Sequence, residues 1–298
     1  MSDSHQEHLP ARLWWVLAGL TLVWGFNWTA MKVAISEIAP FTFRTFCLGI
    51  GSGLLFGYLR ASGQPIAIPR VHWPRLALIS FFTITCWNIL VVFGLQHIPS
   101  GRAAILAYTM PAWSIPLSVL VLGERMTEAK LLGLALGLGG LALLLWDDFA
   151  SFERAPLGSL LVLAASFTWA IGTVLQKKLP VSAPLPALTA WLMLIGGMPI
   201  YLGMLLFEDL GQLSRVGLWP ALGLAYNVFF SFAWGHWAWM KLVTSVSVTV
   251  FSLSMLIIPV VGVLSGMLFL GERLGWNEYA ALLLVLGSLA SVVVAPRR

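Results

Sequence analysis

The chain has 298 residues, of which 59% are hydrophobic and only 10% are charged, and its mean hydropathy is +0.89. Because so small a share of polar residues cannot cover a water-soluble globule of this length, the composition excludes a soluble domain and indicates a protein whose solvent is lipid. The formal net charge of +5 comes from single cations at the ends of apolar runs, so it does not indicate a nucleic-acid partner.

The apolar runs are separated by charged residues and by Pro and Gly clusters, and each has roughly the 20 residues that a membrane-spanning helix needs. They are long and continuous, unlike the short alternating strands of a membrane barrel. The sequence therefore predicts an all-α membrane protein with ten transmembrane helices. In chain order we expect them at Leu13–Ala34, Phe41–Leu59, Pro74–Leu95, Ala103–Leu122, Leu131–Trp146, Leu157–Gln176, Pro186–Phe207, Trp219–Met240, Val246–Leu270 and Trp276–Ala295.

The second half of the chain repeats the first half. The matching features are Trp24 with Trp169, Lys32 with Lys177, Trp73-Pro74 with Trp219-Pro220, Pro111 with Pro259, and Gly123-Glu124-Arg125 with Gly271-Glu272-Arg273. Since each half holds an odd number of helices, the second half would enter the membrane in the opposite orientation. We therefore expect two inverted five-helix repeats, residues 1–146 and 157–298, joined by a linker at 147–156, with a site between them near mid-membrane.

The distribution of cations predicts how the chain is oriented. Ten helices place both termini on one side of the membrane, and 11 Lys and Arg residues then lie on that side against 6 on the other. By the positive-inside rule, we expect both termini in the cytoplasm.

Several motifs together resemble a known family. Trp24-Gly25-Phe26-Asn27-Trp28 is followed by Lys32, by Pro40 with Arg44, and by the two Gly-Glu-Arg turns. In this order they resemble the EamA-type exporters of the drug/metabolite transporter superfamily, over essentially the whole chain. The resemblance implies ten helices in two inverted repeats and export of small metabolites across the bacterial cytoplasmic (inner) membrane. The aromatic richness is similar to that of YddG-type aromatic amino acid exporters. The second half has Trp169-Ala170-Ile171-Gly172, so Asn27 has no counterpart.

Polar and aromatic side chains at mid-helix depth are the candidates for a substrate-binding site. Buried amides, hydroxyls and imidazoles need partners, which are either another helix or a wet cavity. Deep indole rings either pack in the core or stack on an aromatic or large apolar solute. The candidates are Trp24, Asn27, Trp28, Asn88, Tyr108, Trp113, Trp169, Tyr226, Asn227, His236, Trp237, Ser252 and Ser254.

Prolines and cations inside or beside the predicted helices form a second group. Pro111, Pro116 and Pro259 each remove a helical hydrogen bond, so they are candidates for gating or hinge positions, with a plain packing kink as the alternative. Lys32 and Arg44 stand at the outer ends of the first two helices. They either snorkel to lipid headgroups or form a pathway charge that attracts carboxylates.

The acidic residues bear on energy coupling. All 12 Asp and Glu residues fall outside the predicted helix interiors, so the chain lacks the membrane-embedded acid that proton-coupled exporters of cations use. We expect a facilitator that works by alternating access, with amino acids as substrates. A proton-coupled multidrug or nucleobase exporter using His236 is the alternative, and a non-transporting scaffold or receptor is the alternative of another class.

The remaining expectations concern partners and packing. No catalytic constellation, metal spacing or phosphate loop stands out, so we expect no enzyme, no cofactor and no metal. A small-molecule substrate and the bilayer are the expected partners; a monomer suffices and a dimer is compatible. The Gly-Glu-Arg turns are expected to cap helices, with Glu and Arg paired locally. The small-residue spacing of Gly49, Gly53 and Gly57, and of Gly133 and Gly137, predicts close packing within the chain.

Overall fold

The computed structural model describes residues 11–150, 157–245 and 257–294, and over these residues it contains helices and no strand. The predicted all-helical class is confirmed for this part of the chain. The elements are α1 (Ala11–Ala34), α2 (Pro40–Ala61), η1 (Arg70–His72), α3 (Trp73–Ser80), η2 (Phe81–Cys86), α4 (Trp87–His97), α5 (Ser100–Ala107), α6 (Met110–Leu122), α7 (Glu128–Ala150), α8 (Leu157–Lys178), α9 (Leu185–Phe207), η3 (Leu210–Arg215), α10 (Leu218–Ala225), η4 (Tyr226–Trp234), α11 (Gly235–Ser245), α13 (Ile257–Leu270) and α14 (Trp276–Val294).

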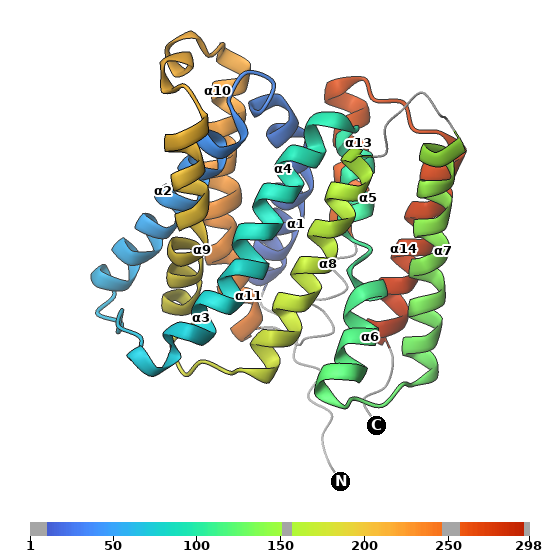
Figure 1. Cartoon of the computed structure of the whole chain (residues 1–298), viewed down its shortest axis with the longest axis horizontal. Coiled ribbons are helices and arrows are strands. Elements are labelled where there is room, and N and C mark those ends of the chain that lie inside the picture. The colour runs from blue at the N-terminus through green and yellow to red at the C-terminus, as the bar shows by residue number, and fades with distance from the viewer. Residues whose placement is uncertain (1–10, 151–156, 246–256, 295–298) are drawn as a thin grey trace.

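The helices stand side by side as one upright bundle (Figure 1). α1 begins and α14 ends at the lower end of the bundle in this view, whereas α8 begins at the upper end. The first helix of the second half therefore runs opposite to the first helix of the first half. α1 packs along α13, α2 along α9, α4 along α8 and α7 along α14, so helices along the whole first half contact the second half.

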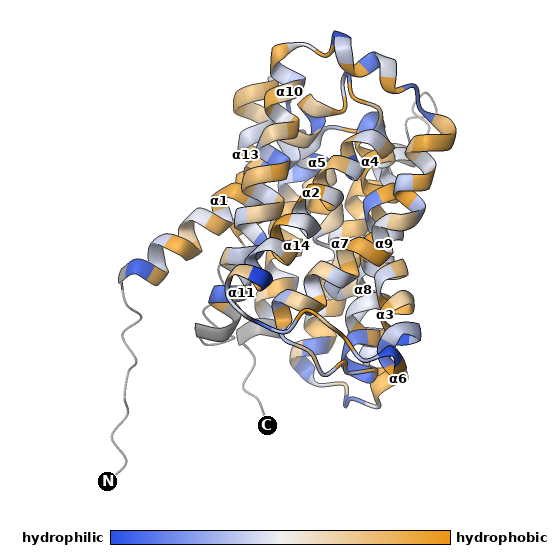
Figure 2. Ribbon diagram, turned by 90° about the vertical axis from the view of Figure 1, so that its left-hand side faces the viewer, coloured by the Kyte–Doolittle hydropathy of each residue, from blue (hydrophilic) through white to orange (hydrophobic). Residues whose placement is uncertain are grey.

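Helix length and composition suit a membrane. Among the described residues, five helical stretches are long and apolar enough to cross a bilayer: Arg70–His97, Ser100–Leu122, Glu128–Trp146, Leu157–Lys178 and Leu185–Phe207. Figure 2 shows apolar residues over the middle of the bundle and hydrophilic residues gathered at its two ends. Large apolar side chains such as Leu120 and Phe207 face outward, which is the pattern of a surface in contact with lipid.

Two of the expected spans are not continuous α-helices. The third contains the π-helical segment η2 between α3 and α4, and the eighth contains the π-helical segment η4 between α10 and α11. Phe81 and Tyr226, which begin these segments, are 145 positions apart, the same offset that relates Lys32 to Lys177. The irregularity thus occurs at matching positions of the two halves. π-Helical turns are uncommon and occur frequently at functional sites.

The fourth expected span is broken. α5 ends at Ala107, a turn follows at Tyr108 and Thr109, and α6 starts again at Met110 with Pro111 in its first turn. Proline fits there because the first turn of a helix has no partner for its amide hydrogen. The break lies where α5 and α6 meet α8, and the Thr109 and Ser166 hydroxyls approach within 3.3 Å there.

The glycine prediction for α2 is wrong. A Cβ atom placed on Gly49, Gly53 or Gly57 would meet nothing within 4 Å, so these glycines do not bring α2 against another helix of the described chain. At Gly137 the prediction is confirmed, because a Cβ atom there would lie 3.1 Å from the Ser288 hydroxyl oxygen and 3.2 Å from the Ala112 methyl group. A close approach also occurs at α13. A Cβ atom on Gly262 would lie 3.0 Å from the Ala104 methyl group and 3.2 Å from the Trp28 ring, so this glycine lets α13 fit between α1 and α5.

Candidate functional site

At each of the two π-helical segments, an asparagine side chain donates a hydrogen bond to a backbone carbonyl group that also accepts from a helical amide. Asn88 donates from Nδ2 to the Ile84 carbonyl at 2.8 Å, and Asn227 donates to the Gly223 carbonyl at 2.9 Å. Both amides are buried, and the Oδ1 atom of Asn227 is buried without a hydrogen-bond partner in the described chain. These two predicted site residues therefore stabilise the π-helical turns, and Asn227 keeps one free acceptor.

Three of the predicted residues lie along the interface between α1 and the span formed by α10, η4 and α11. Tyr226 donates its hydroxyl to the Val23 carbonyl at 3.0 Å, and Trp24 donates from Nε1 to the Ser231 carbonyl at 3.2 Å. The His236 ring lies edge-on to Trp24 with 6.0 Å between ring centroids, and its Nδ1 is 2.8 Å from the Phe232 carbonyl oxygen. We call Trp24, Tyr226 and His236 the aromatic cluster.

The other four tryptophans predicted to stack on substrate lie apart from this cluster. Trp169 contacts Trp87 with 4.9 Å between ring centroids, across the α4–α8 interface. Trp113 packs edge-on to Phe167 at 5.5 Å, and its buried Nε1 has no acceptor in the described chain. Trp28 is buried against α13, whereas Trp237 is exposed on the bundle surface.

The other predicted residues occupy different places. Asn27 is half-buried on α1, and its Oδ1 atom has no hydrogen-bond partner among the described residues; Tyr108 follows the end of α5 at the break. Pro116 lies inside α6, and Pro259 is buried in α13. Ser252 and Ser254 lie outside the described residues. The structure thus brings the aromatic cluster together, and it places the Trp87–Trp169 pair on a separate interface.

A charged clamp holds the junction between α4 and α5. Glu272 accepts hydrogen bonds from the Ser100 amide at 2.6 Å and from the Gly101 amide at 2.9 Å, one on each carboxylate oxygen. Lys32 donates from Nζ to the carbonyl oxygens of Leu95 at 2.5 Å and Ile98 at 2.9 Å. An anion at a helix N-terminus and a cation at a helix C-terminus both match the helix dipole, so the two side chains stabilise the junction from both sides.

The matching turn at the opposite end of the bundle is arranged differently. Glu124 pairs with Lys130 at 2.7 Å and with Lys177, which is the counterpart of Lys32. These two hydrogen bonds lower the pKa of the Glu124 carboxyl group to about 2. The anionic and cationic members of this second clamp therefore bind each other, whereas Glu272 and Lys32 bind backbone groups of the α4–α5 junction.

The Gly-Glu-Arg turns confirm one expectation and correct another. Gly123 has φ +67° at the C-terminus of α6, and Gly271 has φ +64° after α13, so both glycines cap helices in the left-handed region. The expected local pairing of Glu with Arg is wrong in the described chain. Glu124 binds lysines, and Glu272 binds amides 172 and 171 positions away.

The same pattern recurs at other helix starts on the Glu272 side of the bundle. Glu208 accepts from the amides of Phe41 at 2.8 Å and Thr42 at 2.6 Å, at the start of α2. Glu37 accepts from the Gly217 amide at 2.6 Å, just before α10. Carboxylates at this end of the bundle are thus used to satisfy amide groups that helix geometry leaves free.

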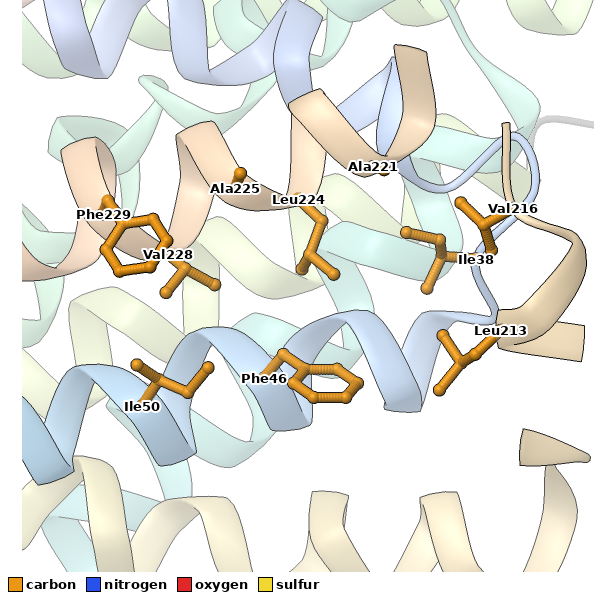
Figure 3. A pocket seen from close by; sticks show the side chains of 10 residues that line it. All are labelled: Ile38, Phe46, Ile50, Leu213, Val216, Ala221, Leu224, Ala225, Val228 and Phe229. Atoms are coloured by element: carbon orange, nitrogen blue, oxygen red, sulfur yellow. The ribbon is translucent and has the colours of Figure 1, made fainter. Parts of the chain in front are cut away.

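An apolar groove of about 270 Å³ runs beside α2 (Figure 3). It opens outward, since the flanking Ile50 and Phe229 are exposed. Its lining comes from α2, η3, α10 and η4 and consists of Ile38, Phe46, Ile50, Leu213, Val216, Ala221, Leu224, Ala225, Val228 and Phe229. Binding sites for small polar solutes need a few placed polar groups, and this groove has only apolar side chains. None of the predicted site residues lines it.

Sequence reasoning missed the clamp and the π-helical segments. The clamp joins residues that are far apart in the chain, and the partners of Glu272 and Lys32 are backbone amides and carbonyl groups that any sequence would supply. One signal was present, because Lys32 and Glu272 both have a counterpart in the other half. The π-helical segments had no comparable signal, since Phe81–Cys86 is as apolar as an ordinary helix interior.

The fold and the charged ends define a multi-pass, all-helical membrane protein, and comparison with known proteins specifies its class. The model of the EamA-like transporter family matches residues 12–146 and again residues 156–294. The chain belongs to this family, so it is a membrane transporter.

Named relatives agree with this assignment. The chain is 27% identical to the uncharacterised transporter YoaV of Bacillus subtilis, over 90% of this chain and 92% of that protein. It is also 27% identical to a probable amino-acid metabolite efflux pump of Salmonella typhimurium, over 91% of each. A solved crystal structure with 20% identity covers 95% of this chain with a TM-score of 0.66, and it shares the fold.

Proposed function

We propose that the chain is an alternating-access carrier that exports small metabolites, chiefly amino acids including aromatic ones. Ten transmembrane helices would form two inverted five-helix repeats, residues 1–146 and 157–298, joined by the linker at 147–156. The opposite directions of α1 and α8 and the two separate matches of the family model support this arrangement. Relatives named as amino-acid metabolite efflux pumps support the substrate class.

The observation that carries the proposal is the difference between the two clamps. An inverted repeat places equivalent parts at opposite faces of the membrane, and alternating access requires one face to be closed while the other is released. Glu272 and Lys32 bind the α4–α5 junction, whereas Glu124 and Lys177 bind each other. Such a difference between equivalent parts is expected of a carrier held in one of two exchangeable states.

The carrier is proposed to work as a facilitator. Within the described helices, the acidic residues lie at the ends, such as Glu128 in the first turn of α7 and Glu278 in the first turn of α14. No described helix therefore offers an acid at mid-depth to exchange a proton for substrate. The alternative, proton coupling through His236, is supported only by the position of this imidazole in the aromatic cluster.

Both termini are proposed to face the cytoplasm of a bacterial inner membrane, from the excess of cations on that side. The Glu272 clamp then faces outward and the Glu124 turn faces inward. The aromatic cluster, the Trp87–Trp169 pair and the free acceptor of Asn227 are the proposed contacts for the solute between the two faces.

Counterflow of radiolabelled amino acids in proteoliposomes tests the proposal. Vesicles preloaded with unlabelled amino acid should take up label whether or not a proton gradient is imposed, and empty vesicles should not. Flux that requires the gradient and is lost in His236→Gln would support the proton-coupled alternative. No flux of any amino acid, nucleobase or cationic drug would instead favour a scaffold or receptor.

A further inference from the structure

We propose that Arg44 binds the carboxylate group of the transported solute on the outward side of the pathway, next to the Glu272 clamp. This inference rests on the proposed carrier function and specifies the chemical group that the carrier recognises. Arg44 sits in the second turn of α2, and the residue as a whole is only 3% exposed.

The surroundings of Arg44 do not neutralise its charge. Its Nη2 atom lies 2.9 Å from the Met31 thioether sulfur, a weak acceptor, and its buried Nε atom has no hydrogen-bond partner in the described chain. The neighbouring Phe43 ring lies 5.3 Å from the guanidinium carbon. A guanidinium group in an apolar interior is unfavourable unless an anion pairs with it, so the site is built for a partner that carries negative charge.

Three of the described carboxylates on this side bind other groups. Glu208 binds the first amides of α2 and Glu37 binds the Gly217 amide, while Glu272 belongs to the clamp. The contrast is Arg102, which is 8% exposed and forms an ion pair of 3.0 Å with Glu278. Two buried arginines at the same end of the bundle therefore differ, because Arg102 has a carboxylate partner and Arg44 has none among the described residues.

The second half carries no charge at the position that corresponds to Arg44. At the offset of 145 positions that relates Lys32 to Lys177, the counterpart of Arg44 is Thr189. The Thr189 hydroxyl donates to the Leu185 carbonyl at 2.9 Å within its own helix. The second half therefore forms its corresponding helix without a charge at this position.

The chemistry of guanidinium favours a carboxylate as this anion. Its planar fork donates two parallel hydrogen bonds to the two oxygens of a carboxylate, and one negative charge neutralises it completely. A phosphate dianion would leave a net negative charge in an apolar site. Met31 precedes Lys32 on α1, so the residue that covers Arg44 is adjacent to the residue that holds the α4–α5 junction. Release of the clamp would therefore uncover Arg44.

Competition in the counterflow assay tests this inference on the unmodified protein. Leucine and phenylalanine should inhibit uptake of label about 10- to 100-fold more strongly than leucinamide and phenylalaninamide, the ratio expected for a lost hydrogen bond to a charged group. Phenyl phosphate should compete weakly. Equal inhibition by acids and amides, or dominance of phenyl phosphate, would overturn the inference while leaving the carrier function intact. Absence of any flux would contradict both the Arg44 inference and the proposed carrier function.

A variant then connects the discrimination to Arg44. Arg44→Gln should reduce the acid-to-amide ratio to about one and still transport the amides, and Arg44→Lys should restore part of the ratio because it keeps the charge without the fork. Arg60→Gln is the matched control, since Arg60 lies on the same helix at its exposed far end. An Arg44→Gln protein that is folded, transports, and keeps the full ratio would contradict the assignment.

Discussion

Glu124 and Glu272 are 148 positions apart at equivalent places of the two halves, yet they bind different partners. Glu272 accepts from two backbone amides at the start of α5, and Glu124 accepts from two lysine side chains. Glu272 thereby closes the α4–α5 junction. Glu124 binds no helix junction of the described chain and stays at the surface of the opposite end of the bundle. The Glu272 turn and the Glu124 turn can therefore be mutated separately to test the alternating-access proposal.

Removing the charge of Glu272 should open the outward face. In Glu272→Gln the amides of Ser100 and Gly101 lose charge-assisted hydrogen bonds, which destabilises the closed junction by about 1–3 kcal/mol. A cysteine introduced at Ser100 should then react faster with an impermeant maleimide. Glu128→Gln, which removes an exposed carboxylate at the start of α7, is the control and should leave the rate unchanged. Equal labelling with and without Glu272 would mean that the clamp does not close this face.

The Glu124 turn should be insensitive to pH in the physiological range. Its pKa is lowered to about 2 by hydrogen bonds from Lys130 and Lys177, so the carboxylate stays ionised above about pH 4 and its contribution is lost only as pH falls towards 2. Counterflow should therefore show no step between pH 5 and 8 that disappears in Glu124→Gln. In Lys177→Met the pKa of Glu124 should rise towards its usual value. A step near pH 6 that depends on Glu124 would contradict the assigned ion pairs.

Truncation of Trp169 should change selectivity by solute size. Trp169→Ala removes one ring of the Trp87–Trp169 pair, so phenylalanine and tryptophan should lose several-fold in apparent affinity while alanine changes little. Trp219→Ala is the control because this indole is exposed on the bundle surface. Competition assays with the three amino acids give the measurement. Equal losses for all of them would show that Trp169 serves packing alone.

The paired prolines should affect turnover more than assembly. Pro111 starts α6 after the break at Tyr108, and Pro259 is its counterpart in α13. The double variant Pro111→Ala and Pro259→Ala should insert normally yet exchange solute about tenfold more slowly, because a continuous helix resists bending at the break. Initial rates of counterflow, normalised to inserted protein, check this. Unchanged rates would assign both prolines to packing.

The positions of the helices were predictable because a helix that crosses lipid must be a long, continuous apolar run. The expected span Leu157–Gln176 corresponds to α8 at Leu157–Lys178, and Pro186–Phe207 corresponds to α9 at Leu185–Phe207. The interruptions were not predictable. A π-helical turn in Phe81–Cys86 changes the backbone hydrogen bonding without leaving a mark in the composition. The break after Ala107 lies a few residues before Pro111, the position at which the sequence indicated an interruption.

The candidate site was predictable only as a set of residue types. Lys32 was recognised as a cation at a helix end, but its partners at Leu95 and Ile98 are backbone carbonyls brought there by packing of α4 against α1. Likewise, nothing local distinguishes the buried Arg44 from a snorkelling arginine. That difference depends on which neighbouring carboxylates are already bound to helix amides, and only the three-dimensional arrangement determines it.

Each charged turn reaches across the boundary between the two halves. Glu272, from the second half, completes the start of α5 in the first half, and Glu124, from the first half, binds Lys177 in the second half. Neither half therefore contains all the partners of its own helix ends. If the chain were divided at the linker and the two pieces were produced as separate polypeptides, each piece would depend on the other for its completion, and function would be recovered only on co-assembly.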